Sequence, residues 1–343
     1  MTFTEGGAGR EWREQIDPRF SMAAAMLRSM EKSGLSRSGV LATTVDLGIQ
    51  MESAFRRVIG VCSRRDAPTV PNVHVGGSGP PIVFVNGWSA SGLVWPAALI
   101  DDLERDHTVL RVDNRGTGWS NRMPTPYTIR DMADDVARML DDQGHRRAVV
   151  AGLSMGGMIS QELALRHPDR VAHLVLMGTR PPNPAYIPPG SDVTARMMSP
   201  PPAGQSLDDF YLQRWAGVTG PGFPIRHPEA VAEMVHAIVE RPSARTAVLD
   251  QARAIAAWHG AYRLQHLEVP TSILHGDDDP LIPVVNAMRL ATLIPEARYH
   301  ELPGVGHLVP YEAPAATLEV VRAASHQAFG RRKPVGARSK TPG

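Results

Sequence analysis

Five residues carry the first chemical signal of the sequence, Gly152-Leu153-Ser154-Met155-Gly156. They end the apolar run RAVVAGLS (147–154) and precede a helix-like segment at 158–170. A serine between small residues at a junction of strand and helix is typical of a sharp turn that exposes a nucleophilic hydroxyl. The glycines let the strand and the helix approach closely. We therefore predict acyl transfer through Ser154.

A serine hydroxyl is a weak nucleophile, so it needs a base, and the base needs an acid that orients it. Downstream, the run LPGVGH places His307 on a glycine-rich loop, and HGDDDP places three aspartates at 277–279. The order Ser, Asp, His along the chain fits this chemistry. An aspartate triplet could also bind a metal, but no glutamate accompanies it and His275 lies back in the predicted strand, so we expect no metal.

The oxyanion formed during acyl transfer needs two N–H donors near the serine. The backbone amide of Met155, directly after the nucleophile, is one candidate. The other should come from the loop 86–89 after an earlier strand, where the pattern places Trp88.

Short apolar runs alternate with helical patterns along most of the chain, and such runs suit strands that are buried on both faces. The predicted strands are 80–87, 107–116, 147–154, 171–178, 271–278 and 297–304. The segment 128–144 has apolar residues at helical spacing, with Thr128 and Asp131 as an N-terminal cap. The alternation predicts an α/β fold with a mostly parallel, doubly wound sheet.

One interval, 180–266, interrupts this alternation. It opens with proline-rich sequence and continues with helical segments such as 228–240 and 243–258, which predicts a mainly helical insertion. Its aromatic and methionine side chains could line an apolar pocket for an uncharged or amphiphilic ester, or could form the core of the insertion itself. The candidate substrate contacts are Tyr186, Met198, Tyr211 and Trp215.

Composition limits the classes of function. The chain has 343 residues, a net charge of +1 and 43% hydrophobic residues, which suits a globular enzyme and does not favour a nucleic-acid partner. Cys62 is the only cysteine, so no intramolecular disulfide can form. The polar N-terminus does not resemble a signal peptide, and no apolar stretch is long enough to span a membrane. We expect a cytoplasmic protein.

The expected domain organisation has five parts. They are a helical N-terminal extension (1–70), the first part of the α/β core (71–179), the insertion (180–266), the second part of the core (267–328) and a basic, disordered tail (329–343). We expect the N-terminal helices to pack on the main body. The alternatives are that they form a homodimer or line the entrance of the site.

Together these motifs resemble the α/β-hydrolase superfamily over about 70–327, in its serine-nucleophile esterase branch. The resemblance rests on VNGWSASG, VDNRGTGWS, GLSMGG, GDDDPLIP and PGVGHLVP. It implies a catalytic triad of Ser154, Asp279 and His307, since GDDDPLIP matches the pattern G-x-x-D-x-x-x-P at Asp279. It also implies that the insertion is a cap over the site.

Three further features refine this resemblance. Asp113, Arg115, Gly116 and Gly118 match the D-x-R-G-x-G segment of the family, which is a structural loop beside the site. Asn86 stands where many relatives have histidine. The stretch VNGWSASGLVWP resembles the corresponding loop of aclacinomycin methylesterase-like enzymes, which remove a methyl ester from a polyketide.

The expected function is hydrolysis of a carboxylic ester or lactone of a small to medium apolar substrate through an acyl-enzyme, with no cofactor. Because the nucleophile is serine, the branches that use a carboxylate to displace halide or open epoxides are disfavoured. The alternatives are a cofactor-free haloperoxidase or perhydrolase, an acyltransferase with the same triad, and, from another class, a ligand-binding scaffold.

Overall fold

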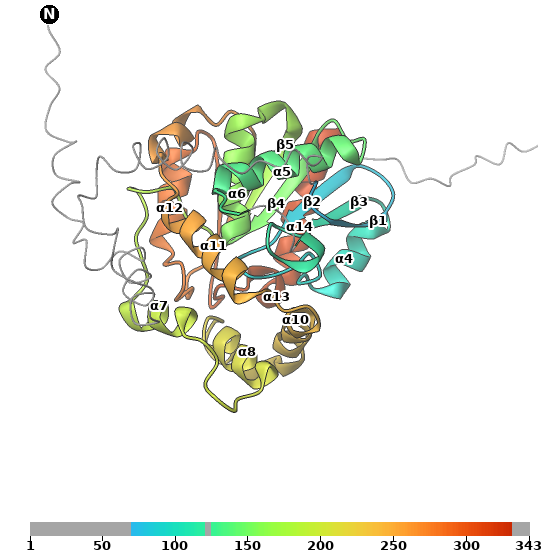
Figure 1. Cartoon of the computed structure of the whole chain (residues 1–343). Helices are drawn as coiled ribbons and strands as arrows, with labels where there is room; N and C mark the ends of the chain where they lie inside the picture. The colour runs from blue at the N-terminus through green and yellow to red at the C-terminus, as the bar shows by residue number, and fades with distance from the viewer. Residues whose placement is uncertain (1–69, 121–124, 331–343) are drawn as a thin grey trace, which may run out of the picture.

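The computed structural model describes residues 70–120 and 125–330. Its centre is a seven-stranded sheet in the order β1-β3-β2-β4-β5-β6-β7 (Figure 1). The strands are β1 (Val73–Gly77), β2 (Pro81–Val85), β3 (Thr108–Val112), β4 (Ala148–Leu153), β5 (Val171–Met177), β6 (Thr271–Gly276) and β7 (Arg298–Leu302). Every pairing is parallel except that of β1 with β3. The predicted mostly parallel sheet is confirmed, and each predicted run contains a strand.

Strand β1 was not predicted from the sequence. It is the edge strand, its residues are half-buried or exposed, and two of its five residues are glycines. An edge strand of this kind carries no buried apolar run, so its sequence does not distinguish it from a loop.

Helices cover both faces of the sheet, as the alternation of strand and helix predicts (Figure 1). The helices of the core are α4 (Ala97–Glu104), α5 (Ile129–Asp142), α6 (Met155–Arg166), α12 (Val285–Leu293), α13 (Val309–Glu312) and α14 (Pro314–Phe329). Successive residues of β2 point to opposite faces. Val83 and Val85 join the core formed with α5, α6 and α12, whereas Ile82 and Phe84 join the core formed with α4 and α14.

Helix α5 begins where the sequence predicts. The Thr128 hydroxyl accepts a hydrogen bond from the Asp131 amide at 3.2 Å, and the Asp131 carboxylate accepts one from the Thr128 amide at 2.8 Å. This reciprocal pair is a capping box, which satisfies two amides that the first helical turn leaves without acceptors.

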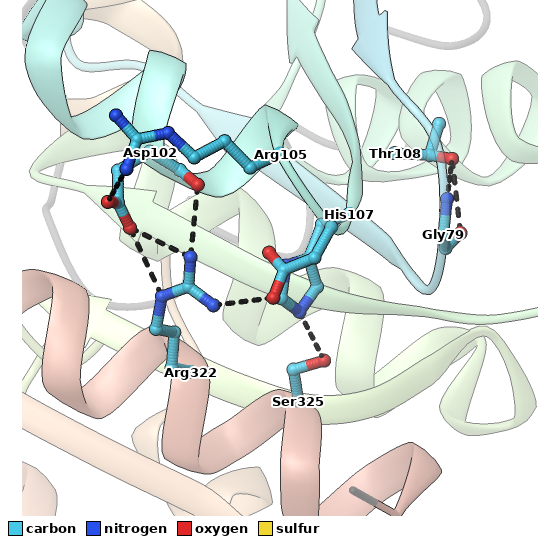
Figure 2. Close-up of polar contacts among 8 residues, drawn as sticks. Gly79, Asp102, Arg105, His107, Thr108, Arg322 and Ser325 are labelled. Carbon is cyan, nitrogen blue, oxygen red and sulfur yellow. Dashed lines mark hydrogen bonds and ion pairs between the residues drawn. The ribbon is translucent and has the colours of Figure 1, made fainter. Parts of the chain in front are cut away.

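Polar contacts fix α14 against α4 and the segment that joins α4 to β3 (Figure 2). Arg322 on α14 donates to the carboxylates of Asp102 at 2.7 Å and Asp106 at 2.8 Å. One turn along the helix, the Ser325 hydroxyl lies 3.0 Å from Nε2 of buried His107. These contacts help to fix the orientation of α14, which also packs on the sheet through apolar side chains.

The chain between β5 and β6 is helical. Its α-helices are α7 (Ser191–Met198), α8 (Leu207–Ala216), α9 (Phe223–Arg226), α10 (Pro228–Glu240) and α11 (Arg245–Ala256). Helices α10 and α11 confirm the predicted helical segments 228–240 and 243–258. Helices α7, α8 and α10 lie together at one end of the molecule (Figure 1). The described residues also contain short 3₁₀ helices at Gly118–Ser120, Pro168–Arg170 and Ala261–His266.

The division of the chain into domains stays a prediction. All of the expected N-terminal extension except residue 70 lies outside the described residues, as do Cys62 and the basic tail beyond residue 330. Phe329, the first residue of the expected tail, is the last residue of α14. Within 70–120 and 125–330, none of the helices is both long and apolar enough to cross a membrane.

Candidate active site

Ser154 lies between the end of β4 and the first residue of α6, at the centre of the sheet. Its backbone has φ 57° and ψ −117°, a conformation that residues with a side chain rarely adopt. The turn is possible because Gly156 has no side chain. A Cβ atom on Gly156 would overlap the carbonyl of Val85 in the neighbouring strand β2. The glycines of the sequence motif therefore permit the close approach of α6 to the sheet that strains the serine.

His307 and Asp279 form a buried pair beside this turn. Nδ1 of His307 lies 2.8 Å from Oδ2 of Asp279, and the two side chains are 2% and 0% exposed. The other oxygen of Asp279, Oδ1, accepts hydrogen bonds from the amides of Leu281 and Ile282, both at 2.8 Å. The carboxylate is thus held in one orientation, with Oδ2 directed at the imidazole.

The other two aspartates of the triplet have different surroundings. Asp277 and Asp278 are exposed, and Oδ1 of Asp277 accepts the amide of Gly304 at 2.7 Å. His275 is buried, which lowers its pKa and favours the neutral ring, and its Nε2–H donates to the Ile282 carbonyl at 2.8 Å. Of the three carboxylates, Asp279 is the one in contact with His307.

Glu312 holds the loop that contains His307 through hydrogen bonds. Its carboxylate accepts the amides on both sides of the histidine, from Gly306 at 2.8 Å and from Leu308 at 2.9 Å, and also the amide of Gly220 at 2.7 Å. Burial raises the pKa of Glu312, although these hydrogen bonds act in the opposite direction. No reasoning from the sequence had identified this residue, because nothing in its immediate neighbours marks a buried carboxylate.

The two candidate oxyanion donors flank Ser154. Among the described residues, neither the Met155 amide nor the Trp88 amide has a hydrogen-bond acceptor. The Met155 amide is free because it belongs to the first turn of α6. The loop with Trp88 is close, since a Cβ atom on Gly87 would lie 3.9 Å from Ser154 Oγ. Within the described residues, the structure thus leaves the amides of Met155 and Trp88 without an acceptor, one directly after the serine and the other in a loop that approaches it.

Side chains from other segments hold this loop in shape. Asn86 is fully buried, and its side chain donates to the Ala90 carbonyl at 2.7 Å. Gln251 on α11 accepts the Ser89 amide at 2.8 Å, and the indole N–H of Trp88 donates to the Val248 carbonyl at 2.9 Å. Helix α11 therefore helps to set the position of a candidate oxyanion donor. Gln251 has no signal in the sequence, because the contact joins segments about 160 residues apart.

The D-x-R-G-x-G segment contacts the chain that follows the same loop. Buried Asp113 accepts hydrogen bonds from the amides of Gly92 at 2.7 Å and Trp119 at 2.9 Å, and from the side chain of Asn72 at 2.8 Å. Burial alone would raise the pKa of Asp113, but these hydrogen bonds and that of His74 outweigh it and lower the pKa. The hydrogen bonds of Asp113 thus hold the D-x-R-G-x-G segment against the chain at Gly92.

One cavity joins the candidate residues. Ser154 and His307 both line it, although no hydrogen bond links Ser154 Oγ to His307. Such contacts are often loose in enzymes without a bound substrate. The cavity has a volume of about 80 Å³. Of the predicted substrate contacts, Tyr186, Met198 and Trp215 line it. Tyr211 does not line it, and its side chain packs against the apolar cluster of the insertion.

Comparison with known proteins adds to this geometry. The model of the alpha/beta hydrolase fold family matches residues 80–220. A poly(3-hydroxyalkanoate) depolymerase from Ectopseudomonas oleovorans is 34% identical over 230 residues, which cover 66% of this chain and 78% of that protein. The chain belongs to the α/β-hydrolase family.

Other members of the family agree with this assignment. A non-heme haloperoxidase from Rhodococcus erythropolis is 29% identical over 246 residues, covering 67% of this α/β-hydrolase and 86% of that protein. The enol-lactonase from Burkholderia xenovorans LB400 is similar in structure, with a TM-score of 0.63 and 25% identity over 74% of this chain and 95% of its own. Its relatives include a depolymerase, an esterase and lactone-degrading enzymes, and this α/β-hydrolase is an enzyme, a hydrolase of the ester or lactone type.

Proposed function

We propose that this α/β-hydrolase cleaves a carboxylic ester or lactone through an acyl-enzyme on Ser154. The observation that carries the proposal is the buried Asp279–His307 pair, which shares one cavity with a serine in a strained turn. Strain of this kind persists where the surrounding structure holds it, and it concentrates at functional sites.

In the proposed mechanism, Nε2 of His307 takes the proton of the Ser154 hydroxyl as Oγ attacks the ester carbonyl. Asp279 keeps Nδ1 protonated and stabilises the imidazolium that forms. The amides of Met155 and Trp88 stabilise the negative charge on the tetrahedral intermediate. His307 then returns the proton to the departing alcohol, and a water molecule repeats the sequence on the acyl-enzyme.

The cavity supports a small to medium, largely apolar substrate. Its lining is mostly aliphatic and aromatic, with residues such as Met197, Met234, Ile238 and Ile255 on the side of the insertion. Apolar walls contribute binding energy, whereas a few polar groups set orientation. The residues of the insertion that line the cavity support a role of the insertion as a cap over Ser154.

The test is turnover of p-nitrophenyl esters from acetate to laurate, of a lactone and of an aromatic methyl ester. Wild type and Ser154→Ala are measured together, with Ser199→Ala as the control, since Ser199 is exposed at the end of α7. Ser154→Ala should lower kcat by about 10⁶-fold, and Ser199→Ala should leave it unchanged. Activity of Ser154→Ala within about tenfold of wild type would refute the assignment of the nucleophile.

A second candidate, perhydrolysis, is supported by the similarity to the Rhodococcus erythropolis non-heme haloperoxidase. It would use the same residues with peroxide in place of water. Peracid formation from acetate and hydrogen peroxide, at a rate above that of ester hydrolysis, would favour this candidate over the first.

A further inference from the structure

Arg180 is a fully buried cation in the wall of the cavity that contains Ser154. It follows β5 at the start of the insertion and is 1% exposed. One terminal nitrogen donates to the Pro181 carbonyl at 2.9 Å, and the other donates to the Ile255 carbonyl at 2.8 Å. The third nitrogen, Nε, is buried and has no hydrogen-bond partner among the described residues. The Nε–H donor of the guanidinium group is therefore unused.

The charge of Arg180 is also without an anionic partner in the part of the chain that the structure describes. Its neighbours are aromatic, with the ring of Tyr186 4.1 Å away and that of Trp258 5.4 Å away. The nearby carboxylate of Glu162 instead accepts hydrogen bonds from Trp258 and Arg263. Burial lowers the pKa of Arg180 to about 10, so the group stays cationic at neutral pH. Buried charges without partners are rare in folded proteins because they are costly.

Two other residues that line the cavity also carry a buried donor without a hydrogen-bond partner in the described part of the chain. Nε1 of Trp215 and the hydroxyl of Tyr311 also have no hydrogen-bond partner among the described residues. Buried polar groups are nearly always hydrogen-bonded, so three such groups on residues that line one cavity are an exception that needs an explanation. A ligand that brings acceptor oxygens into the cavity would supply it.

We propose that Arg180 binds an anionic group of the substrate, a carboxylate distant from the ester bond that is cleaved. This inference rests on the proposed function and narrows its substrate class to half-esters of dicarboxylic acids. A carboxylate oxygen accepts the Nε–H of Arg180 and neutralises the buried charge, while Trp215 and Tyr311 donate to other oxygens of the substrate. Arginine suits this part because its planar group stays charged and presents several donors in fixed directions.

The test compares substrates that differ in charge and hardly in size. These are p-nitrophenyl half-esters of adipic, pimelic and suberic acid, each paired with the analogue whose free carboxylate is a carboxamide. Rates with Ser154→Ala are subtracted to remove spontaneous hydrolysis. At the best chain length, wild type should have a kcat/KM about 10- to 100-fold higher for the carboxylate, as expected for a hydrogen bond to a charged group.

Variants of Arg180 separate binding from folding. Arg180→Gln should lower kcat/KM for the carboxylate by about the same 10- to 100-fold, and change that for the carboxamide less than about threefold. Arg253→Gln is the matched control, since its side chain is exposed on α11, the helix that also carries Ile255. It should leave the ratio between the two substrates unchanged.

Three results would overturn the inference. They are equal kcat/KM of wild type for both members of every pair, a preference for the carboxamide, and an equal loss on both substrates in Arg180→Gln. The last would mean that Arg180 only holds the insertion to the core.

Calorimetry measures the binding of both substrates to Ser154→Ala, which requires neither turnover nor a folded Arg180→Gln. If Arg180→Gln does not fold, Ser154→Ala still tests the preference for the carboxylate, and equal affinities for the two substrates would contradict the proposal. If wild type hydrolyses no ester, the proposed function fails, and the same titration tests Arg180 independently.

Discussion

Replacing Asp279 by asparagine is the sharpest test of the candidate site, because the structure fixes how the new amide would lie. Oδ1 of Asp279 accepts two backbone amides, from Leu281 and Ile282. In Asp279→Asn, the amide oxygen must stay at that position, since an NH₂ group there would face two donors. The NH₂ group is therefore directed at Nδ1 of His307, 2.8 Å away in the wild type.

This orientation changes the tautomer of the imidazole. Nδ1 becomes an acceptor, so the proton moves to Nε2, and Nε2 can no longer take the proton of the Ser154 hydroxyl. The exchange of carboxylate for amide keeps the volume of the side chain, so the fold should survive. We expect kcat to fall by about 10⁴-fold, or about 5.4 kcal/mol of transition-state stabilisation.

The assay is steady-state hydrolysis of the best p-nitrophenyl ester, together with a thermal melt of each variant. Asp278→Asn is the matched control, because Asp278 is an exposed neighbour of the same residue type. It should keep kcat within about twofold, as expected for a surface substitution away from the site. A kcat for Asp279→Asn within about tenfold of wild type, or a greater loss in Asp278→Asn, would refute the reasoning.

Three further predictions concern stability. Gly156→Ala should yield little folded protein, because its Cβ overlaps the Val85 carbonyl, and a normal thermal melt would contradict this account of the turn. His173 is buried on β5, and burial followed by the charge of Arg298 lowers its pKa to about 4. Its unfolded pKa is near 6.5, so its contribution is complete above pH 6.5 and is lost at up to about 1.4 kcal/mol per pH unit as the pH falls toward 4. In urea titrations, His173→Gln should flatten that slope, and an unchanged slope would show that another group causes it. Arg322→Met should lower the free energy of unfolding by about 1 kcal/mol, whereas Arg105→Met, at a more exposed contact of Asp102, should change it little. Equal effects of the two arginine variants would exclude a specific part for the α14 contact.

The sequence predicted the elements with strong local patterns. Strands β2 to β6 are buried apolar runs, and the Thr128 cap of α5 is a short-range contact. Both features depend only on residues that are close together in the sequence, so the sequence predicts them. Strand β1 escaped prediction because an edge strand needs no such run. Among the substrate candidates, Tyr211 could not be separated from Trp215, four residues later, because both types suit a cavity wall and an apolar core equally well.

The candidate site divides in the same way. The sequence by itself determined the strand, turn and helix around Ser154, because glycine spacing and apolar periodicity are local properties of the backbone. It also indicated that a histidine and an aspartate follow in a suitable order. Only the tertiary structure decided that His307 contacts Asp279 and that Glu312 and Gln251 hold the surrounding loops. It also decided that Arg180 is buried beside the cavity, with no carboxylate partner among the residues that the structure describes. Burial and pairing of charged groups depend on which distant segments fold against them, and a local pattern of residues does not predict these long-range contacts.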